Sequence, residues 1–524
     1  RLVKSGNKKR GRNITVGAVV GMLLSCTAVM GADEYLWIKN DGGIKFSTDN
    51  STPVSTGNPY KENTWDGADY VNNIALNSTS TDYGLKLEGD LTGVNFINNS
   101  LITITGSNGS FGIHNEGTMG DIKNTGLIIG ENTGIDNESY GIYNNKTMGN
   151  VTNTGLMTGT GTENYAGDGI YNNETMGTVM NTGMITGIGK VNARGIFLQG
   201  GTTTTAVCND GLIIAVGERF VFGIYNNGTL QEDIINNGLI LVTINADVLN
   251  ATGSLSYGIA AFNSGTTKII KNIGLIIGKS INGENNHGIY NQSRGVRVTN
   301  IGSVVNITTG TGNAYGVSNL GSQSSWIVSI VNSGLITGTI TGSGNAYGIF
   351  NEPYSGSGAE IGTITNTGVV YGKTNAIKNT DNSASGGTAG GTITSLDNYG
   401  ILVTEGSEVI SNDTYAVITN TPNYYGLQIK NGGTSLGDVT TAYSGNTSRD
   451  NIIVGNDGTT DLKRNMTIKN NMATDGTGSI NGDENDSILN ALKNTYEVIG
   501  TNDKVAGSII NAYEEAVVFN TADK

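Results

Sequence analysis

The fold of this chain is decided by one pattern that recurs along it. Residues 140–156 read YGIYNNKTMGNVTNTGL, and the neighbouring copies read FGIHNEGTMGDIKNTGL (111–127) and DGIYNNETMGTVMNTGM (168–184). Along the chain, Gly-Ile or a close variant recurs from Gly84 to Ala376 at a mean interval of about 29 residues, and Asn-x-Gly follows most copies. Two motifs that share one period indicate a repeat architecture.

The residues within each repeat favour strands over helices. Short β-branched, alternating segments are separated by Asn-Gly and Thr-Gly turns, and 80 of the 524 residues are glycine, which helical repeats avoid. We therefore predict an all-β protein, a right-handed parallel β-helix (β-solenoid) with about 29 residues per coil. About eleven coils stacked at about 4.8 Å would be roughly 50 Å long.

Residues at equivalent positions of such coils should form ladders along the axis. The aliphatic residue after the repeat glycine should build one buried column, formed by Ile113, Ile142, Ile170, Ile196, Ile224, Ile259 and Ile289. The asparagine of Asn-x-Gly should stand at a coil corner and bond to its neighbours above or below, in a column formed by Asn124, Asn153, Asn181, Asn209, Asn272 and Asn300. Half of the 22 tyrosines flank the Gly-Ile pair. We interpret them as stacked architectural rings, and an aromatic surface for glycans is the alternative.

The first 32 residues read as an export signal. A basic stretch from Lys4 to Arg12 precedes an apolar run from Ile14 to Met30, and the run ends in Gly31-Ala32. This order is typical of a secretory signal peptide with cleavage after Ala32. A membrane anchor and a lipoprotein site at Cys26 are the alternatives. The run continues past Cys26, which argues against lipidation there.

The rest of the chain divides into three regions by its pattern. Residues 33–80 hold two tryptophans and two prolines, and we expect them to form a cap over the exposed end of the stack. Residues 81–405 should be the regular coils, and residues 406–524 a degenerate solenoid region.

Charge and side-chain chemistry favour binding over catalysis. After residue 32 the chain keeps 24 basic and 44 acidic residues, so phosphate backbones are repelled and we expect no nucleic-acid partner. His114 and His287 lie six coils apart, about 29 Å along the axis, so they cannot share a site. We expect no enzymatic activity and no cofactor or metal, with a polysaccharide hydrolase or lyase as the alternative. Calcium binding by the acidic loops 457–461 and 475–486 is a further alternative, although they lack the spacing of a calcium loop.

Taken together, the signal segment and the Tyr-Gly-Ile-Tyr-Asn-Asn and Asn-Thr-Gly-Leu-Ile units resemble the passenger region of bacterial autotransporters, the type V secreted adhesins. This resemblance covers nearly the whole chain. It implies an exported protein at the cell surface or outer membrane, or released outside the cell, which presents loops to a receptor or glycan. It also implies an outer-membrane β-barrel translocator in cis or in trans. Residues 440–524 lack the alternating strands of a barrel, so we expect either that the barrel lies beyond Lys524 or that the chain is exported by a different route.

Binding should reside where the repeat is interrupted, because insertions escape the demands of stacking. The long intervals predict protruding segments at Thr243 to Ser256 and Gly321 to Trp326, with further loops at Pro353 to Ala359 and Ser383 to Gly391. Trp326 is the only tryptophan beyond the N-terminal region, and we single it out as a possible contact residue. Its alternative is a ring packed over the aliphatic ladder. Cys208, the only cysteine after the signal, is interpreted as a tolerated thiol.

Overall fold

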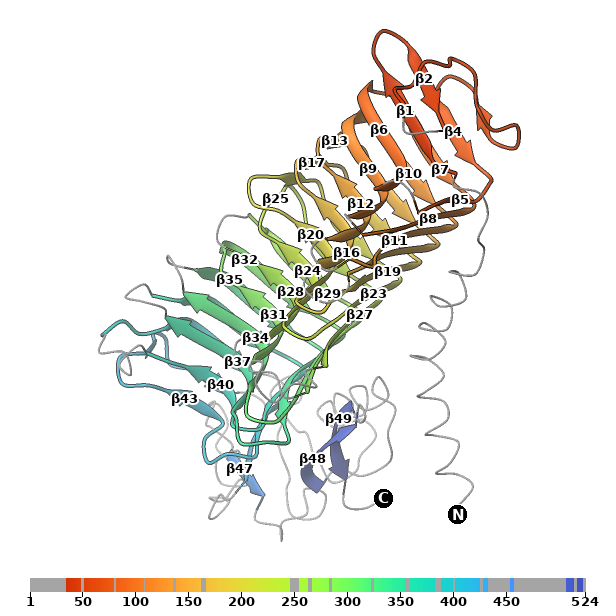
Figure 1. Ribbon diagram of the computed structural model, residues 1–524. Coiled ribbons are helices and arrows are strands. Elements are labelled where there is room, and N and C mark those ends of the chain that lie inside the picture. The colour runs from red at the N-terminus through yellow and green to blue at the C-terminus, as the bar shows by residue number, and fades with distance from the viewer. Residues whose placement is uncertain are drawn as a thin grey trace, which may run out of the picture.

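A computed structural model of the chain describes residues 34–48, 51–79, 82–107, 109–134, 138–161, 166–245, 254–262, 266–281, 285–321, 325–353, 358–381, 388–398, 401–424, 427–431, 453–456, 506–512 and 516–521. Within these residues the secondary structure is entirely β, and nearly all strands belong to three long sheets. The strands of each sheet stack like rungs along one elongated body (Figure 1).

Sheet A begins at the N-terminal end with the antiparallel pair β1 and β2, and its other strands run parallel. It is formed by β1 (Leu36–Asn40), β2 (Ile44–Ser47), β6 (Tyr83–Leu91), β9 (Ser110–Met119), β12 (Ser139–Asn144), β13 (Thr147–Met148), β16 (Ala166–Asn172), β17 (Thr175–Met176), β20 (Asn192–Leu198), β21 (Thr203–Thr204), β24 (Phe220–Asn226), β25 (Thr229–Leu230), β28 (Leu255–Ala261), β31 (Asn285–Asn291), β34 (Asn313–Gly321), β37 (Ala346–Pro353), β40 (Asn375–Asn379) and β43 (Ile410–Asn412).

Sheets B and C complete each coil. Sheet B is formed by β3 (Thr64–Trp65), β4 (Asp69–Asn72), β7 (Asn95–Asn98), β10 (Ile122–Asn124), β14 (Val151–Asn153), β18 (Val179–Asn181), β22 (Val207–Asn209), β26 (Ile234–Asn236), β29 (Ile269–Asn272), β32 (Arg294–Asn300), β35 (Trp326–Asn332), β38 (Glu360–Asn366), β41 (Thr392–Asn398), β44 (Val417–Ile418) and β45 (Asn423–Tyr424). Sheet C is formed by β5 (Leu76–Ser78), β8 (Leu101–Gly106), β11 (Leu127–Asn132), β15 (Leu156–Thr160), β19 (Met184–Ile188), β23 (Leu212–Gly217), β27 (Leu239–Asn245), β30 (Leu275–Ile281), β33 (Ser303–Thr309), β36 (Leu335–Ile340), β39 (Val369–Gly372), β42 (Ile401–Thr404), β46 (Leu427–Asn431) and β47 (Ile453–Asn456).

The chain passes through sheets A, B and C in turn, and each pass is one coil. In the regular coils a strand therefore pairs in parallel with its copies about one repeat earlier and one repeat later, as β12 does with β9 and β16. From β6 to β42 the described strands make about eleven coils. The predicted all-β parallel β-solenoid is confirmed, and its right-handed winding stays a prediction.

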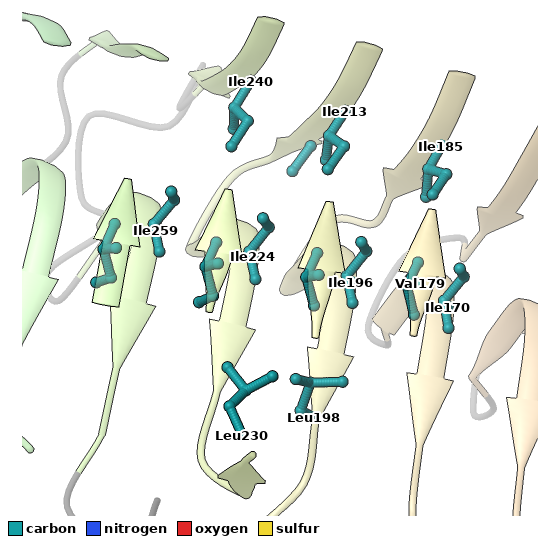
Figure 2. Packing of buried hydrophobic residues seen from close by; sticks show 14 of the residues in the cluster. Ile170, Val179, Ile185, Ile196, Leu198, Ile213, Ile224, Leu230, Ile240 and Ile259 are labelled. Atoms are coloured by element: carbon teal, nitrogen blue, oxygen red, sulfur yellow. The ribbon is translucent and has the colours of Figure 1, made fainter. Parts of the chain in front are cut away.

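Three aliphatic rows fill the interior, one from each sheet. The seven isoleucines expected in one column are register partners on sheet A, and each is fully buried. Figure 2 shows Ile170, Ile196, Ile224 and Ile259 of this row facing Ile185, Ile213 and Ile240 of sheet C. At about 25 cal/mol per Å² of apolar surface, such rows supply the main force that holds the coils closed.

The glycine before each of these isoleucines lets sheets A and C come close together. A Cβ on Gly223 would lie 2.3 Å from Ile240 Cγ2 and 2.5 Å from the carbonyl oxygen of Gly258 in the next coil. No side chain larger than a hydrogen atom fits without a shift of the backbone. The recurrence of Gly-Ile is therefore a packing requirement of the narrow coil.

The N-terminal end of the stack is closed by antiparallel strands. β2 pairs with β1 and β3 pairs with β4, whereas β1, β4 and β5 pair in parallel with β6, β7 and β8. Phe46, Trp65 and Tyr70 pack there with ring centroids 5.6–6.4 Å apart. The segment expected to be a cap thus contributes parallel strands as well as this aromatic end.

Toward the C-terminus, β43 to β47 continue the three sheets beyond the regular coils, and β48 (Ala506–Ala512) and β49 (Ala516–Thr521) form an antiparallel pair. Most of the expected protruding segments, at 246–253, 322–324, 354–357 and 382–387, lie outside the described residues.

Candidate functional site

The asparagine of Asn-x-Gly forms a continuous ladder at the corner between sheets B and C. Each side-chain amide donates from Nδ2 to Oδ1 of its partner in the next coil, at 2.7–2.9 Å. The ladder joins Asn72, Asn98, Asn124, Asn153, Asn181, Asn209, Asn236, Asn272, Asn300, Asn332, Asn366 and Asn398. All of them are at most 1% exposed, so the ladder is part of the frame and does not face a ligand.

A second asparagine ladder, which the sequence analysis did not assign, follows the aromatic-Asn unit of sheet A. It joins Asn115, Asn144 and Asn172 at 2.7 Å, and Asn291, Asn319, Asn351, Asn379 and Asn412 at 2.7–2.8 Å. Between these runs Leu198 occupies the asparagine position, and Asn172 donates instead to Thr204 Oγ1 at 3.0 Å. The regular recurrence of an asparagine directly after the aromatic residue is the sequence feature that could have predicted this ladder.

Aromatic rings line the outer face of sheet A in two columns, one before the repeat glycine and one after the isoleucine. Successive rings along a column lie 4.4–5.7 Å apart, as Tyr257, His287 and Tyr315 do. Rings of the first column are largely covered, with Tyr140 only 3% and Tyr257 4% exposed. This coverage favours an architectural role for the first column, because a platform for sugar rings needs open ring faces, whereas Tyr143, Tyr171 and Tyr225 of the second column are partly exposed.

Both histidines are members of these columns. His114 pairs in register with Tyr143, and His287 with Tyr257 and Tyr315. Burial lowers the pKa of His287 to about 3, and its Nδ1 lies 2.8 Å from Ser318 Oγ. Burial lowers the pKa of His114 to about 4, against the opposing effect of the Glu116 carboxylate. Both imidazoles are therefore neutral at pH 7.

An ion pair interrupts the first aromatic column. Asp168 and Arg194 occupy ring positions in adjacent coils, and Arg194 Nε donates to Asp168 Oδ1 at 2.8 Å. The guanidinium carbon lies 4.0 Å from the ring centroid of Phe197. Burial raises the pKa of Asp168 to about 6 despite the nearby guanidinium. This pair was not predicted from the sequence, although both residues precede a repeat glycine.

Trp326 lies on the outer face of sheet B, at the start of β35. It is 41% exposed and pairs in register with Arg294 on one side and Glu360 on the other. A Cβ on Gly362 would lie 3.7 Å from Trp326 Nε1, so the indole extends over the bare glycine of the neighbouring strand. The ring is therefore half open to solvent and is not packed over the interior ladder.

Positive charge gathers beside Trp326. Lys268 and Lys271 belong to the coil of β29, and Arg294 and Arg297 belong to β32, the strand between β29 and β35. Arg294, Arg297 and Lys268 are exposed and Lys271 is partly exposed. Within the described part of the chain, no ion pair involves Lys268, Lys271 or Arg297. We call Trp326 and these four cations the Trp326 patch.

The other positions singled out from the sequence give no evidence of a ligand site within the described residues. Cys208 is partly exposed on the outer face of sheet B, between Met180 and Ile235, and burial raises the pKa of its thiol. In the described ranges no three His, Cys, Asp or Glu side chains are arranged to hold a metal ion. The same ranges contain no helix with the length and apolar character needed to cross a bilayer. Ala32, Cys26 and the acidic loops lie outside the described residues.

No protein-family model matches the chain, and no curated protein or solved structure shows significant similarity to it.

Proposed function

We propose that this chain is the passenger of an exported surface protein of the autotransporter kind. It acts as a stiff stalk and adhesin that presents its loops and outer faces to host cells or other bacteria, by binding and without catalysis. An outer-membrane β-barrel, on the same or another chain, would carry it across the membrane.

One observation carries this proposal: the asparagine ladder runs unbroken from Asn72 to Asn398 through the stacked coils. Eleven coils at about 4.8 Å make a body roughly 50 Å long. Each coil is joined to the next by three sheets and by buried amides, so bending would break many hydrogen bonds at once. A long, stiff body is suited to holding binding residues away from a surface.

Surface display is tested on intact cells that produce the chain. Antibodies against the solenoid should label these cells, and external protease should remove the label. A label that appears only after cell lysis would contradict the proposal.

Adhesion is tested with beads coated with the purified chain. Two variants, Trp326→Ala and a deletion of 247–253, should each lower adherence to host cells while circular dichroism shows an unchanged β content. Tyr415→Ala is the matched control, because Tyr415 is a 46% exposed aromatic residue outside the Trp326 patch. Full adherence by both folded variants would contradict this assignment of the binding residues.

A further inference from the structure

The Trp326 patch is unusual for this chain in its charge. The whole chain has a net charge of −14, yet four cations meet in two adjacent coils of one sheet face. In the column of Lys271, the five preceding coils present Lys123, Thr152, Met180, Cys208 and Ile235. Clustered cations of this kind attract anions, and their attraction falls off over about 10 Å at moderate salt.

Acidic residues bound the patch at both ends along the axis. Glu360 lies one coil beyond Trp326, and Asp233 lies one coil before Lys268. Burial raises the pKa of Asp233, Glu232 raises it further, and the ammonium groups of Lys268 and Lys271 oppose this rise. The cations therefore act as a localised site about two coils wide, flanked by negative charge.

The shape of the patch limits what can occupy it. Three coils of sheet B span about 10 Å along the axis, and a seven-residue strand spans about 23 Å. That area is well below the roughly 800 Å² per partner of a stable protein interface. Lys271 lies in register with Val331, five residues along β35 from Trp326. An extended polymer that runs obliquely along the strands can therefore reach both ends of this narrow site, which a folded protein uses less well.

The patch combines cationic side chains with an aromatic ring, so its ligand should combine negative charge with an apolar face. Ammonium and guanidinium groups pair with carboxylates, and the open face of the Trp326 indole packs against the apolar C–H face of a sugar ring. DNA carries one charge per about 1.7 Å, so the acidic residues around the patch would repel it strongly. A polysaccharide with one carboxylate on some of its sugars has far lower charge density.

We propose that the Trp326 patch binds an acidic polysaccharide with carboxylate-bearing sugars. This inference rests on the proposed adhesive function and names its ligand class and site. Arg297 and Lys271 hold the carboxylates, and Trp326 supports a sugar ring further along the same polymer.

Binding of the purified full-length chain is measured with hyaluronan and polygalacturonate as probes and dextran as the neutral control. We expect both acidic probes to bind, dextran not to bind, and affinity to fall as NaCl is added. The double variant Lys271→Gln/Arg297→Gln should weaken binding by about threefold to thirtyfold, and Trp326→Ala by about tenfold. Lys123→Gln, an exposed lysine of the same column far from the patch, should leave affinity unchanged.

Several results would overturn the inference. These are equal binding of dextran, equal or tighter binding of single-stranded DNA, salt-independent affinity of the unmodified chain, or unchanged affinity of both patch variants while circular dichroism shows them folded. Adherent beads that bind neither acidic probe would overturn the ligand class and leave the proposed function standing. A chain that binds the probes but is absent from the cell surface would overturn the proposed function alone.

Discussion

Single side chains in this protein owe their roles to their position in a column. Asn181 donates to Asn209 Oδ1 at 2.7 Å and accepts from Asn153 Nδ2 at 2.8 Å, and it also donates to the carbonyl oxygen of Leu212. The same residue type at a turn exposed to water would gain little from these bonds. Here the side chain is 1% exposed, so every partner that is lost stays buried and unsatisfied.

Replacing Asn181 with leucine should lower stability by about 1–3 kcal/mol, because Asn209 Oδ1 then loses its donor inside the corner. The measurement is the urea midpoint of unfolding. Met180→Leu, on the same strand but 39% exposed, is the control and should change stability by less than about 0.5 kcal/mol. An unchanged midpoint for Asn181→Leu would mean that the ladder is solvated.

His287 should make the fold sensitive to acid. Its pKa is about 3 in the folded chain and near 6.5 when unfolded, so the unfolded chain binds the proton more readily. The stabilisation is complete above about pH 6.5 and is lost as pH falls toward 3. His287→Phe keeps a ring in the column and should flatten the pH dependence of the urea midpoint over this window. Identical pH profiles for the two proteins would contradict the assignment.

At the scale of strands, the sequence period predicted which residues pair, because each strand must meet its copy one coil away. It did not predict where a column changes. Leu198 takes an asparagine position and Thr204 takes the position of Met176, so polar and apolar sites exchange within one coil. The sequence alone does not show this exchange, because it depends on Asn172 reaching Thr204 in the next coil. Trp326 was singled out from the sequence, but the cations of the Trp326 patch were not, because irregular register in β32 determines which residue of that strand pairs with Trp326.

Close approach of sheets A and C constrains the repeat glycine at Gly223, although Ala376 occupies the equivalent position in β40. Gly223→Ala should lower stability by about 1–3 kcal/mol, because the added methyl group meets Ile240 and the backbone of Gly258. Gly43→Ala is the control, since a Cβ at Gly43 has no atom within 4 Å. Equal urea midpoints for the two variants would show that sheets A and C leave room for a methyl group at Gly223.

In the whole molecule, the asparagine ladders, the aromatic columns and the Trp326 patch all require coils that stack in register. Neighbouring coils present Thr152, Met180, Cys208 and Ile235 as partners on the outer face of sheet B. In-register partners of adjacent strands lie about 4.8 Å apart, which is within the Cα separation of about 4.4–6.8 Å that a disulfide allows. The single native thiol in the coils therefore reports on the register directly.

The most direct test is oxidation of the Met180→Cys variant, with Cys26 replaced by alanine. The register predicts an intramolecular disulfide between positions 180 and 208, seen as a peptide cross-link by mass spectrometry after proteolysis. Thr182→Cys, two residues further along the same coil and also exposed, should stay unlinked to Cys208. A cross-link formed equally well from position 182, or from position 182 alone, would contradict the in-register solenoid.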